Sequence, residues 1–553
     1  MVSRLSLLAA AFLLFTPHPS QSRIVSDGLA TPTPVATLAF RPGSWAPQPR
    51  TASREVRDPI ASLLDRARGE PVEIFADLAF RLLEATKIPQ NQKSALLEEV
   101  FERAPQAREP HPWSLAQPAY PNGPALARAQ IQPLRLDALS LRGRAIQLLL
   151  AANPRHAVEL FDQIPTIQLP PAACEDPYVA SIDPLYETLL PVVTRGRFTP
   201  EEREKKRPLE MVLRRLRELR SPAELIPATR LVLDLIRSQN WPADDLINAY
   251  ASALASLQSD DRTFSFTIAS ARALVYGFAL GSELRQRGAS PVAILSAWRT
   301  FLGRHLSAAR CSDSYARLNP ETANEKWRDA FLAERVFNNT LTLWQVTDVP
   351  PLTADEVRPD RLGGVSSDPP WPNAQELNTL YSAINRLRTN GESEAWITVA
   401  ERQTPEWDQR AAPVLRRIED FRGISKMTAN DVWLQRVELW RSMIDAAPPG
   451  SIFERAVQGW IAEMSDARAR AEQPALWVAQ FESGFRLARS FSKEEARELE
   501  DTRKKIPGIR IPGLPHPSGA AILDAMRNAP DPALALSADL ESIAPKSHGS
   551  WAK

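Results

Sequence analysis

Apolar residues recur at helical spacing along most of this chain, and the stretch from Leu136 to Pro165 shows the pattern most clearly. Its two parts each have one apolar face: Leu139, Ala145, Ile146, Leu149 and Leu150, then Ala157, Leu160, Phe161 and Ile164. Steps of three, four and seven residues place each set on one side of an α-helix. Between them, Asn153 suits a helix cap and Pro154 the first position of a helix. The stretch predicts two short helices packed as a hairpin.

Similar units are expected along the rest of the chain. Residues 79–85 and 100–105 resemble 145–151 and 160–165, but the spacing is too irregular for a strict repeat. Further helices are predicted at 71–86, 91–104, 178–195, 200–219, 222–238, 242–257, 263–287, 291–306, 321–338, 374–388, 393–402, 405–421, 429–446, 451–472, 474–491, 493–505 and 520–526. This pattern predicts an all-α fold built as an irregular α-solenoid-like array of helical hairpins, with a closed α/α toroid as the alternative.

Proline content suggests how the chain is divided. Residues 349–372 contain six prolines and two glycines, so no helix is expected to cross them. Just before them, Leu341–Thr347 alternates apolar and polar residues, as a strand does. The expected segments are a signal peptide (1–22), a Pro/Thr-rich disordered leader (23–56), a helical domain (57–348), a Pro-rich linker or long loop (349–372), a second helical region (373–505) and an irregular C-terminal tail (506–553).

The amino-terminal pattern predicts export. Arg4 precedes an apolar run from Leu5 to Phe15, and small residues at Ser20-Gln21-Ser22 suit a cleavage site. The run is too short to span a bilayer as a helix, and no later stretch reaches 18 apolar residues. We therefore expect a mature chain that starts near Arg23, has no transmembrane span and is periplasmic or extracellular.

Export affects how the two cysteines are interpreted, because disulfides form in oxidising compartments. Cys174 and Cys311 each lie at the edge of a predicted helix. Two cysteines in an oxidising compartment are expected to pair, so a Cys174–Cys311 disulfide is predicted, with two unpaired thiols as the alternative.

Charge and motifs exclude several classes of function. The 67 basic and 66 acidic residues nearly cancel, whereas a nucleic-acid-binding protein normally carries a basic excess. The sequence contains no GxSxG, HExxH, CxxC, GxxxxGK or GxGxxG motif. No two of the six histidines have ligand spacing, so neither a metal site nor a cofactor is expected.

Tryptophan is concentrated in the second half of the chain. Trp433, Val437, Trp440 and Ile444 follow steps of four, three and four, which predicts a buried helical stripe. Trp371, in Pro-Pro-Trp-Pro, is the tryptophan expected to be exposed, and it is the candidate for ligand binding.

One short motif carries a family resemblance. Phe481-Glu482-Ser483-Gly484-Phe485 resembles the Glu-Ser-x-Phe element of soluble lytic transglycosylases, which also act outside the cytoplasm and join a helical array to a catalytic domain. The resemblance implies that Glu482 is an acid/base that cleaves peptidoglycan strands. The Gly-Leu-Met-Gln stretch expected downstream is absent.

Two functions follow from these observations. The first is a non-catalytic exported scaffold that binds protein or cell-envelope partners and has no catalytic residue. The alternative is a secreted or periplasmic glycan-active enzyme, either transglycosylase-like with Glu482 or of the α/α-toroid type.

Overall fold

The computed structural model describes residues 59–85, 88–115, 130–170, 178–238, 240–257, 267–307, 310–312, 323–353, 355–356, 362–364, 374–389, 402–488 and 519–543. They belong to one compact unit, Arg57–Lys553. The described part is mostly helical, which confirms the predicted all-α class. The signal peptide and leader predicted at 1–22 and 23–56 lie outside the described residues, and the other segment boundaries stay predictions.

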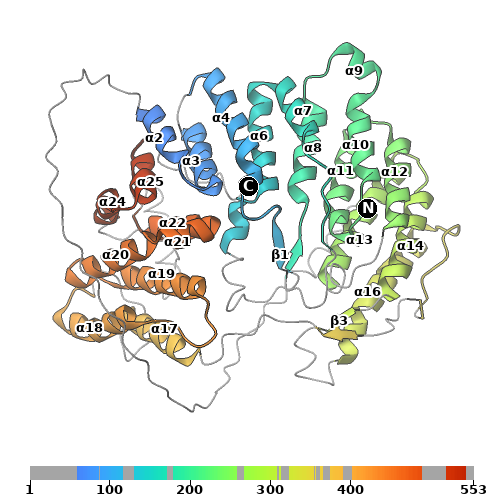
Figure 1. The fold of residues 1–553 in the computed structure, drawn as a ribbon. Helices are drawn as coiled ribbons and strands as arrows, with labels where there is room; N and C mark the ends of the chain where they lie inside the picture. The colour runs from blue at the N-terminus through green and yellow to red at the C-terminus, as the bar shows by residue number, and fades with distance from the viewer. Residues whose placement is uncertain are drawn as a thin grey trace. The chain divides into compact units, whose positions relative to one another are not determined.

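The helices of the first block pack against one another in chain order (Figure 1). They are α2 (Pro59–Ala67), α3 (Val72–Ala85), α4 (Gln90–Arg103), α6 (Ala138–Ala152), α7 (Pro154–Asp162), α8 (Asp183–Arg195), α9 (Pro200–Glu204), α10 (Arg207–Arg217), α11 (Leu225–Arg237), α12 (Ala243–Ser256), α13 (Thr267–Gln286), α14 (Val292–Ser307) and α16 (Ala323–Trp344). One row runs α4, α6, α8, α11, α13, α16, each helix packed on the next. In a second row α10 packs on α12 and α12 on α14.

The predicted hairpin is confirmed as α6 and α7. Asn153 ends α6 and begins α7, and its side chain accepts a hydrogen bond from the backbone N–H of His156 at 3.2 Å. Pro154 occupies the first turn of α7, where a missing N–H leaves no broken hydrogen bond. Most of the two predicted stripes is fully buried, which supplies the packing that helices this short need to be stable.

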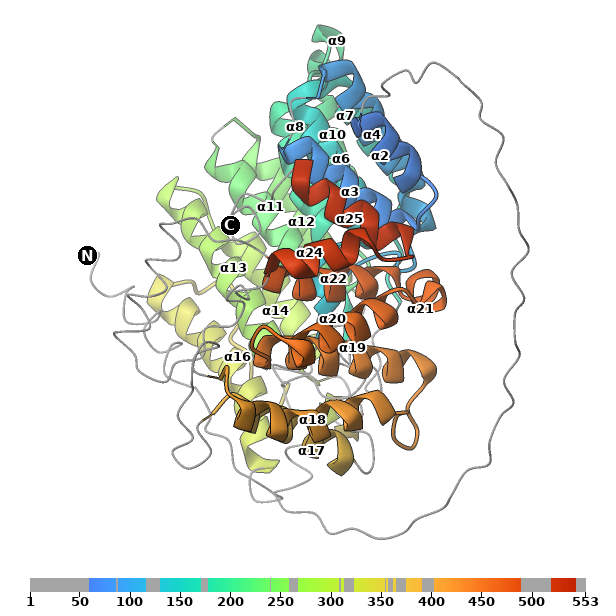
Figure 2. The same ribbon diagram turned by 90° about the vertical axis from the view of Figure 1, so that its left-hand side faces the viewer.

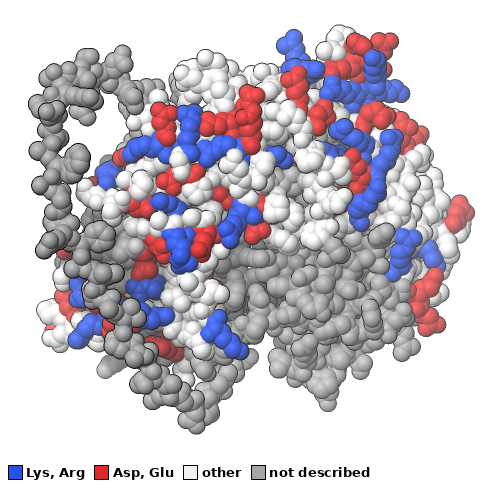
Figure 3. All heavy atoms as spheres, viewed as in Figure 1, with Lys and Arg blue, Asp and Glu red and all other residues white. Residues whose placement is uncertain are grey.

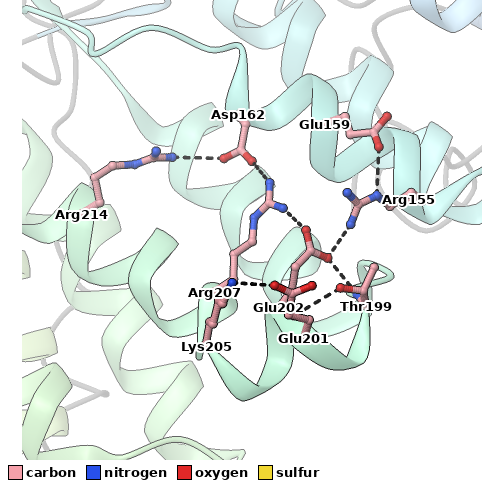
Figure 4. Close-up of polar contacts among 9 residues, drawn as sticks. All are labelled: Arg155, Glu159, Asp162, Thr199, Glu201, Glu202, Lys205, Arg207 and Arg214. Carbon is pink, nitrogen blue, oxygen red and sulfur yellow. Dashed lines mark hydrogen bonds and ion pairs between the residues drawn. The ribbon is translucent and has the colours of Figure 1, made fainter.

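A cluster of ion pairs, the α7–α10 ion cluster, fixes this hairpin to the next one (Figure 4). Arg207 at the start of α10 contacts both Asp162 of α7 and Glu202 of α9. Glu202 also contacts Arg155 of α7 at 2.5 Å and accepts the backbone N–H of Thr199 at 2.8 Å. The hydrogen bond from Thr199 and the neighbouring Arg155 lower the pKa of Glu202 to about 2. The charged run from Glu201 to Arg207 therefore makes contacts between helices and also presents an exposed face.

The helices of the second block are α17 (Gln375–Leu387), α18 (Pro405–Asp420), α19 (Ala429–Ala446), α20 (Ser451–Met464), α21 (Ala467–Glu472), α22 (Pro474–Ala488), α24 (Gly519–Arg527) and α25 (Pro532–Ile543). The predicted stripe on α19 is buried at Trp433, Val437, Trp440 and Ile444. At the end of this block α22 and α25 pack on α3, and α25 also packs on α2 (Figure 2). The first two helices of the first block therefore contact the last helices of the second block.

The strand predicted at Leu341–Thr347 is wrong, because α16 continues to Trp344. Phe337, Leu341 and Trp344 are spaced by four and three, so they share the packed face of the helix, while Leu343 is 77% exposed. The apolar and polar residues alternate at Leu341–Thr347 only because this segment includes the end of the packed face of α16.

Strands occur instead in two short pairs within the described residues. β1 (Trp113–Leu115) pairs antiparallel with β2 (Tyr178–Ala180), and β3 (Arg310–Ser312) pairs parallel with β4 (Leu362–Gly364). The helix predicted from residue 178 accordingly begins only at Asp183.

The short helix predicted at 520–526 is confirmed as α24, and a further helix, α25, follows where an irregular tail was predicted. Ala533, Leu534, Leu536 and Ala538 of α25 are buried. Their burial comes from contact with α2, α3 and α24, which a local sequence pattern does not reveal. Within the ranges that the structure describes, no helix is long and apolar enough to cross a membrane.

Candidate functional site

Glu482, the candidate acid/base, lies on α22 at the contact with α3. Its carboxylate is 3.8 Å from Nη1 of Arg81, whose side chain is only 1% exposed. Arg81 is also 3.8 Å from Asp77, one turn earlier on α3. The contact gives Glu482 a structural role, since it helps to offset the charge of a buried guanidinium where the two blocks meet.

The neighbours of Glu482 also have packing roles. Phe481 is buried and stacks on Trp477 with ring centroids 5.7 Å apart. Gly484 lies so close to the indole of Trp460 that a Cβ there would be 2.3 Å from Cζ2. Packing thus accounts for residues that the resemblance assigned to a catalytic motif, and catalysis by Glu482 stays a prediction.

The other predicted site residues are not tested. Cys174 and Trp371 lie outside the described residues, and Cys311 is described only as a backbone position of β3. The disulfide and the ligand-binding role of Trp371 therefore stay predictions.

The structure contains a small pocket that the sequence did not predict, with a volume of about 40 Å³. Its lining comes from α3, the connection between α4 and α6, the start of α6 and α22. The lining residues are Glu73, Arg108, Glu109, His111, Pro112, Trp113, Ile131, Gln132, Leu136, Asp137 and Ala475. We call it the Glu73 pocket. It brings together side chains from four separate segments of the chain.

Residues 108–112 form one wall because backbone hydrogen bonds hold them across the start of α6. Arg108 N–H donates to the Glu73 carboxylate at 2.7 Å. The carbonyls of Glu109 and Pro110 accept the first N–H groups of α6, at 2.9 and 3.2 Å. Asp137 caps the same helix and accepts from Ser140 N–H at 2.8 Å. These contacts satisfy donors that a helix start leaves without intrahelical partners.

Burial controls the electrostatics of the pocket. It raises the pKa of Glu73, against a hydrogen bond from Arg108, and it raises the pKa of Asp137, against hydrogen bonds from Ser140. Burial also lowers the pKa of His111. Each group is shifted toward its uncharged form, because removing a charge from water is costly.

His111 is the one aromatic base in the pocket wall. The residue is 6% exposed, and its buried Nδ1 makes no hydrogen bond within the described residues. Its ring meets that of Trp113 edge-on at 5.0 Å, and Trp113 Nε1 donates to Glu109 at 2.9 Å. A buried ring nitrogen without a partner can hydrogen-bond a small bound group.

A half-buried glutamine next to the pocket wall contacts the second block. Gln130, which precedes the wall residue Ile131, donates to Glu438 of α19 at 2.8 Å. It accepts from Gln480 of α22 at 2.7 Å. These side chains are separated by more than 300 residues in sequence, so they hold the pocket only when both blocks are folded.

Across the described residues, no group of three or more His, Cys, Asp or Glu is placed to hold a metal ion. The sequence signal for the pocket was Glu109-Pro-His-Pro-Trp113, a titratable and aromatic cluster inside a Pro-rich connection. Comparison with family models, with curated proteins and with solved structures found no match to this chain.

Proposed function

We propose that the protein is an exported, non-catalytic helical scaffold that binds a protein or cell-envelope component. The observation that supports this proposal best is the packing of consecutive hairpins in two rows, α6, α8, α11 and α13 against α7, α10, α12 and α14. We interpret these rows as an irregular α-solenoid-like array. Such arrays stack short units that contact mainly their neighbours, and they bind partners along extended surfaces.

The distribution of charge also favours partners that carry no strong net charge. On the face in Figure 3, basic and acidic side chains alternate over the described area. Many charged side chains of the described residues pair with each other, as Arg144 does with Glu84 at 2.6 Å and Arg68 with Glu99 at 2.9 Å. Paired charges of both signs create little long-range attraction for a polyanion, so shape and local contacts would select the partner.

Exposed apolar side chains offer a place to look for the partner. Val275 of α13 and Leu343 of α16 are large apolar residues that remain exposed, and their helices pack on each other. Single exposed apolar residues are common on protein surfaces. Val275 and Leu343 are therefore positions at which a docking face can be tested by mutation. The main support for the proposed binding function remains the hairpin array.

The decisive experiment compares binding with digestion. The wild-type protein is incubated with purified peptidoglycan sacculi, beside Glu482→Gln and the matched surface variant Glu201→Gln, whose side chain is 74% exposed. Retention on the sacculi, or on a defined envelope protein, without release of soluble glycan fragments is the expected result. Fragment release by wild type and Glu201→Gln, lost in Glu482→Gln, would overturn the proposal in favour of the transglycosylase-like alternative.

Export is tested separately. Amino-terminal sequencing of the protein recovered from outside the cytoplasm should begin near Arg23. Recovery of the full chain from the cytoplasm alone would contradict this part of the proposal.

A further inference from the structure

The segment of residues 349–353 lies against one face of α14 and α16, which pack on each other (Figure 1). We call this segment the strap. Val349 and Leu352 are each 2% exposed, while the two prolines between them are exposed. The two buried residues are three positions apart, which is the period at which side chains of an extended polyproline helix return to one side. The strap therefore has two apolar anchors on the side that faces the helices.

The sequence of the strap favours an extended conformation. Proline fixes its own φ at about −65° and disfavours the helical conformation in the residue before it. Pro350 and Pro351 therefore keep Val349 and Pro350 out of a helix, and α16 has already ended at Trp344. The two prolines also have no backbone N–H to donate. A segment that is extended before it binds loses little conformational freedom on binding, which is why short Pro-rich segments are common ligands of proteins.

Side chains of the two helices bind the main chain of the strap. Asn338 of α16 makes two hydrogen bonds to one residue: Nδ2 donates to the Leu352 carbonyl at 2.8 Å, and Oδ1 accepts from the Leu352 N–H at 2.8 Å. Arg299 of α14 donates to the carbonyls of Pro350 and Pro351 at 3.3 and 3.4 Å. All these hydrogen bonds use main-chain groups of the strap. Any extended segment that presents the same main-chain groups can therefore make them.

Packing and charge restrict which segments fit this face. The Leu352 side chain lies against Gly303, one turn after Arg299 on α14, where a Cβ on Gly303 would be 3.8 Å from Cδ2 of Leu352. Arg299 also pairs with Glu356 at 2.6 Å, and Glu356 accepts from the Thr353 N–H at 2.8 Å. A matching segment therefore has an apolar residue, two prolines and a second apolar residue, with an acidic residue shortly afterwards.

From these contacts we propose that the face of α14 and α16 around Asn338 binds an extended apolar-Pro-Pro-apolar segment of a partner protein, and that the strap occupies this face in the free protein. The inference rests on the proposed function, because it names the kind of segment that a protein partner presents. Release of the strap breaks no helix, since the strap lies beyond the end of α16. A partner has to compete with a tethered segment, whose effective concentration is on the order of mM. The strap is therefore an autoinhibitory contact.

The test supplies the sequence of the strap as a separate peptide. A fluorescein-labelled peptide of residues 347–356 is titrated with the full-length wild type and with the full-length double variant Val349→Ser/Leu352→Ser, whose strap lacks its anchors. Fluorescence anisotropy should show saturable binding to the double variant, at least ten-fold tighter than to the wild type. A control peptide with Leu352→Asp should bind at least ten-fold more weakly. No saturable binding to the folded double variant, or equal binding of both peptides, overturns the inference.

A second variant covers the case in which the loss of two buried anchors prevents folding, which circular dichroism detects. Pro350→Gly/Pro351→Gly changes only exposed residues of the strap and makes the strap more flexible. It should bind the peptide at least three-fold more tightly than the wild type does. Glu201→Gln on the exposed part of α9 should behave like the wild type. Peptide affinity of the proline variant equal to that of Glu201→Gln overturns the competition between strap and peptide.

Changes at Asn338 assign the binding to this face. Added to whichever strap variant folds, Asn338→Leu removes both hydrogen bonds to the main chain and should weaken peptide binding at least ten-fold. Asn338→Asp keeps the acceptor and should recover part of the affinity. Asn338 also donates to Glu334 within α16 at 2.7 Å, so circular dichroism checks that the helix persists. Unchanged affinity in folded Asn338→Leu overturns the assignment.

The outcomes for the two proposals are separable. Failure of the peptide titration leaves the scaffold proposal standing. Failure of envelope binding by both the wild type and the strap variant removes the scaffold proposal and leaves the peptide result valid.

Discussion

Gly484 provides a sharp test of how the second block is packed. In Gly484→Ala the added methyl carbon would lie 2.3 Å from Cζ2 and 2.7 Å from Cε2 of Trp460. Carbon atoms in contact are normally about 3.5–4.0 Å apart, so α20 and α22 would have to separate by about 1 Å. Trp460 is completely buried and has little room to move. Overpacking of this kind costs about 1–3 kcal/mol.

Helix propensity acts in the opposite direction. Alanine is more favourable than glycine inside a helix by about 1 kcal/mol, so the expected net loss for Gly484→Ala is about 1–2 kcal/mol. Gly303→Ala on α14 is the matched control, because its nearest atom would be 3.8 Å away on Leu352. That variant should be stabilised by up to about 1 kcal/mol.

Guanidinium unfolding of both variants, followed by tryptophan fluorescence and circular dichroism, measures the difference. Midpoints are compared, because a unit of this size need not unfold in two states. A midpoint for Gly484→Ala at or above that of Gly303→Ala would refute the packing of α22 on Trp460. Replacing Trp460 with Phe should reduce the cost of Gly484→Ala, as expected for two residues in contact.

Three further predictions concern caps, ion pairs and pH. Asn153→Ala should lower the free energy of unfolding by about 1 kcal/mol, measured by denaturant titration, while Asn153→Asp preserves the cap of α7. Arg470→Met should cost about 3 kcal/mol, because it removes the ion-pair partner of Asp531, whose side chain is 3% exposed. The other carboxylate oxygen of Asp531 keeps its hydrogen bonds from the N–H groups of Ala533 and Leu534. Arg66→Met should cost less than about 1 kcal/mol, because Arg66 is 47% exposed. With its pKa lowered to about 2, Glu202 stabilises the fold above pH 4.5 and loses this effect as pH falls toward 2. When the pH is lowered from 4.5 toward 2, the midpoint temperature of thermal unfolding should fall less in Glu202→Gln than in the wild type.

The elements that the sequence predicted well are those whose signals are local. The hairpin of α6 and α7 has its stripes and its Asn153-Pro154 turn within thirty residues. The stripe of Trp433 and Trp440 on α19 likewise follows from spacing alone. The helix predicted at 200–219 was less accurate, because Lys206 adopts a left-handed conformation (φ 54°) that separates α9 from α10. Pro208, two residues after Lys206 and in the first turn of α10, is the sequence signal for that break.

The pocket could not be predicted because its residues come from distant parts of the chain. Glu73, Asp77 and Arg81 follow one another at intervals of four on α3, a spacing that usually indicates a solvent-facing stripe. All three are buried, because residues 108–112 cover one end of the stripe and α22 lies beside Arg81 at the other. A charged stripe beside strongly apolar neighbours such as Phe75 and Phe80 is the sequence signal for such a buried charged face.

The contact of α2 and α3 with the last helices of the chain has a consequence for biosynthesis. Arg66 of α2 contacts Asp539 of α25, and 473 residues separate them. At about 5–20 residues per second, this interval corresponds to roughly half a minute to a minute and a half of synthesis. Until α22 and α25 are made, the Arg81 end of the charged face of α3 and the parts of α2 and α3 that pack on these helices are uncovered. The emerging chain therefore needs protection from aggregation for as long as its last helices are missing, and truncations near the carboxyl end should damage the beginning of the fold first.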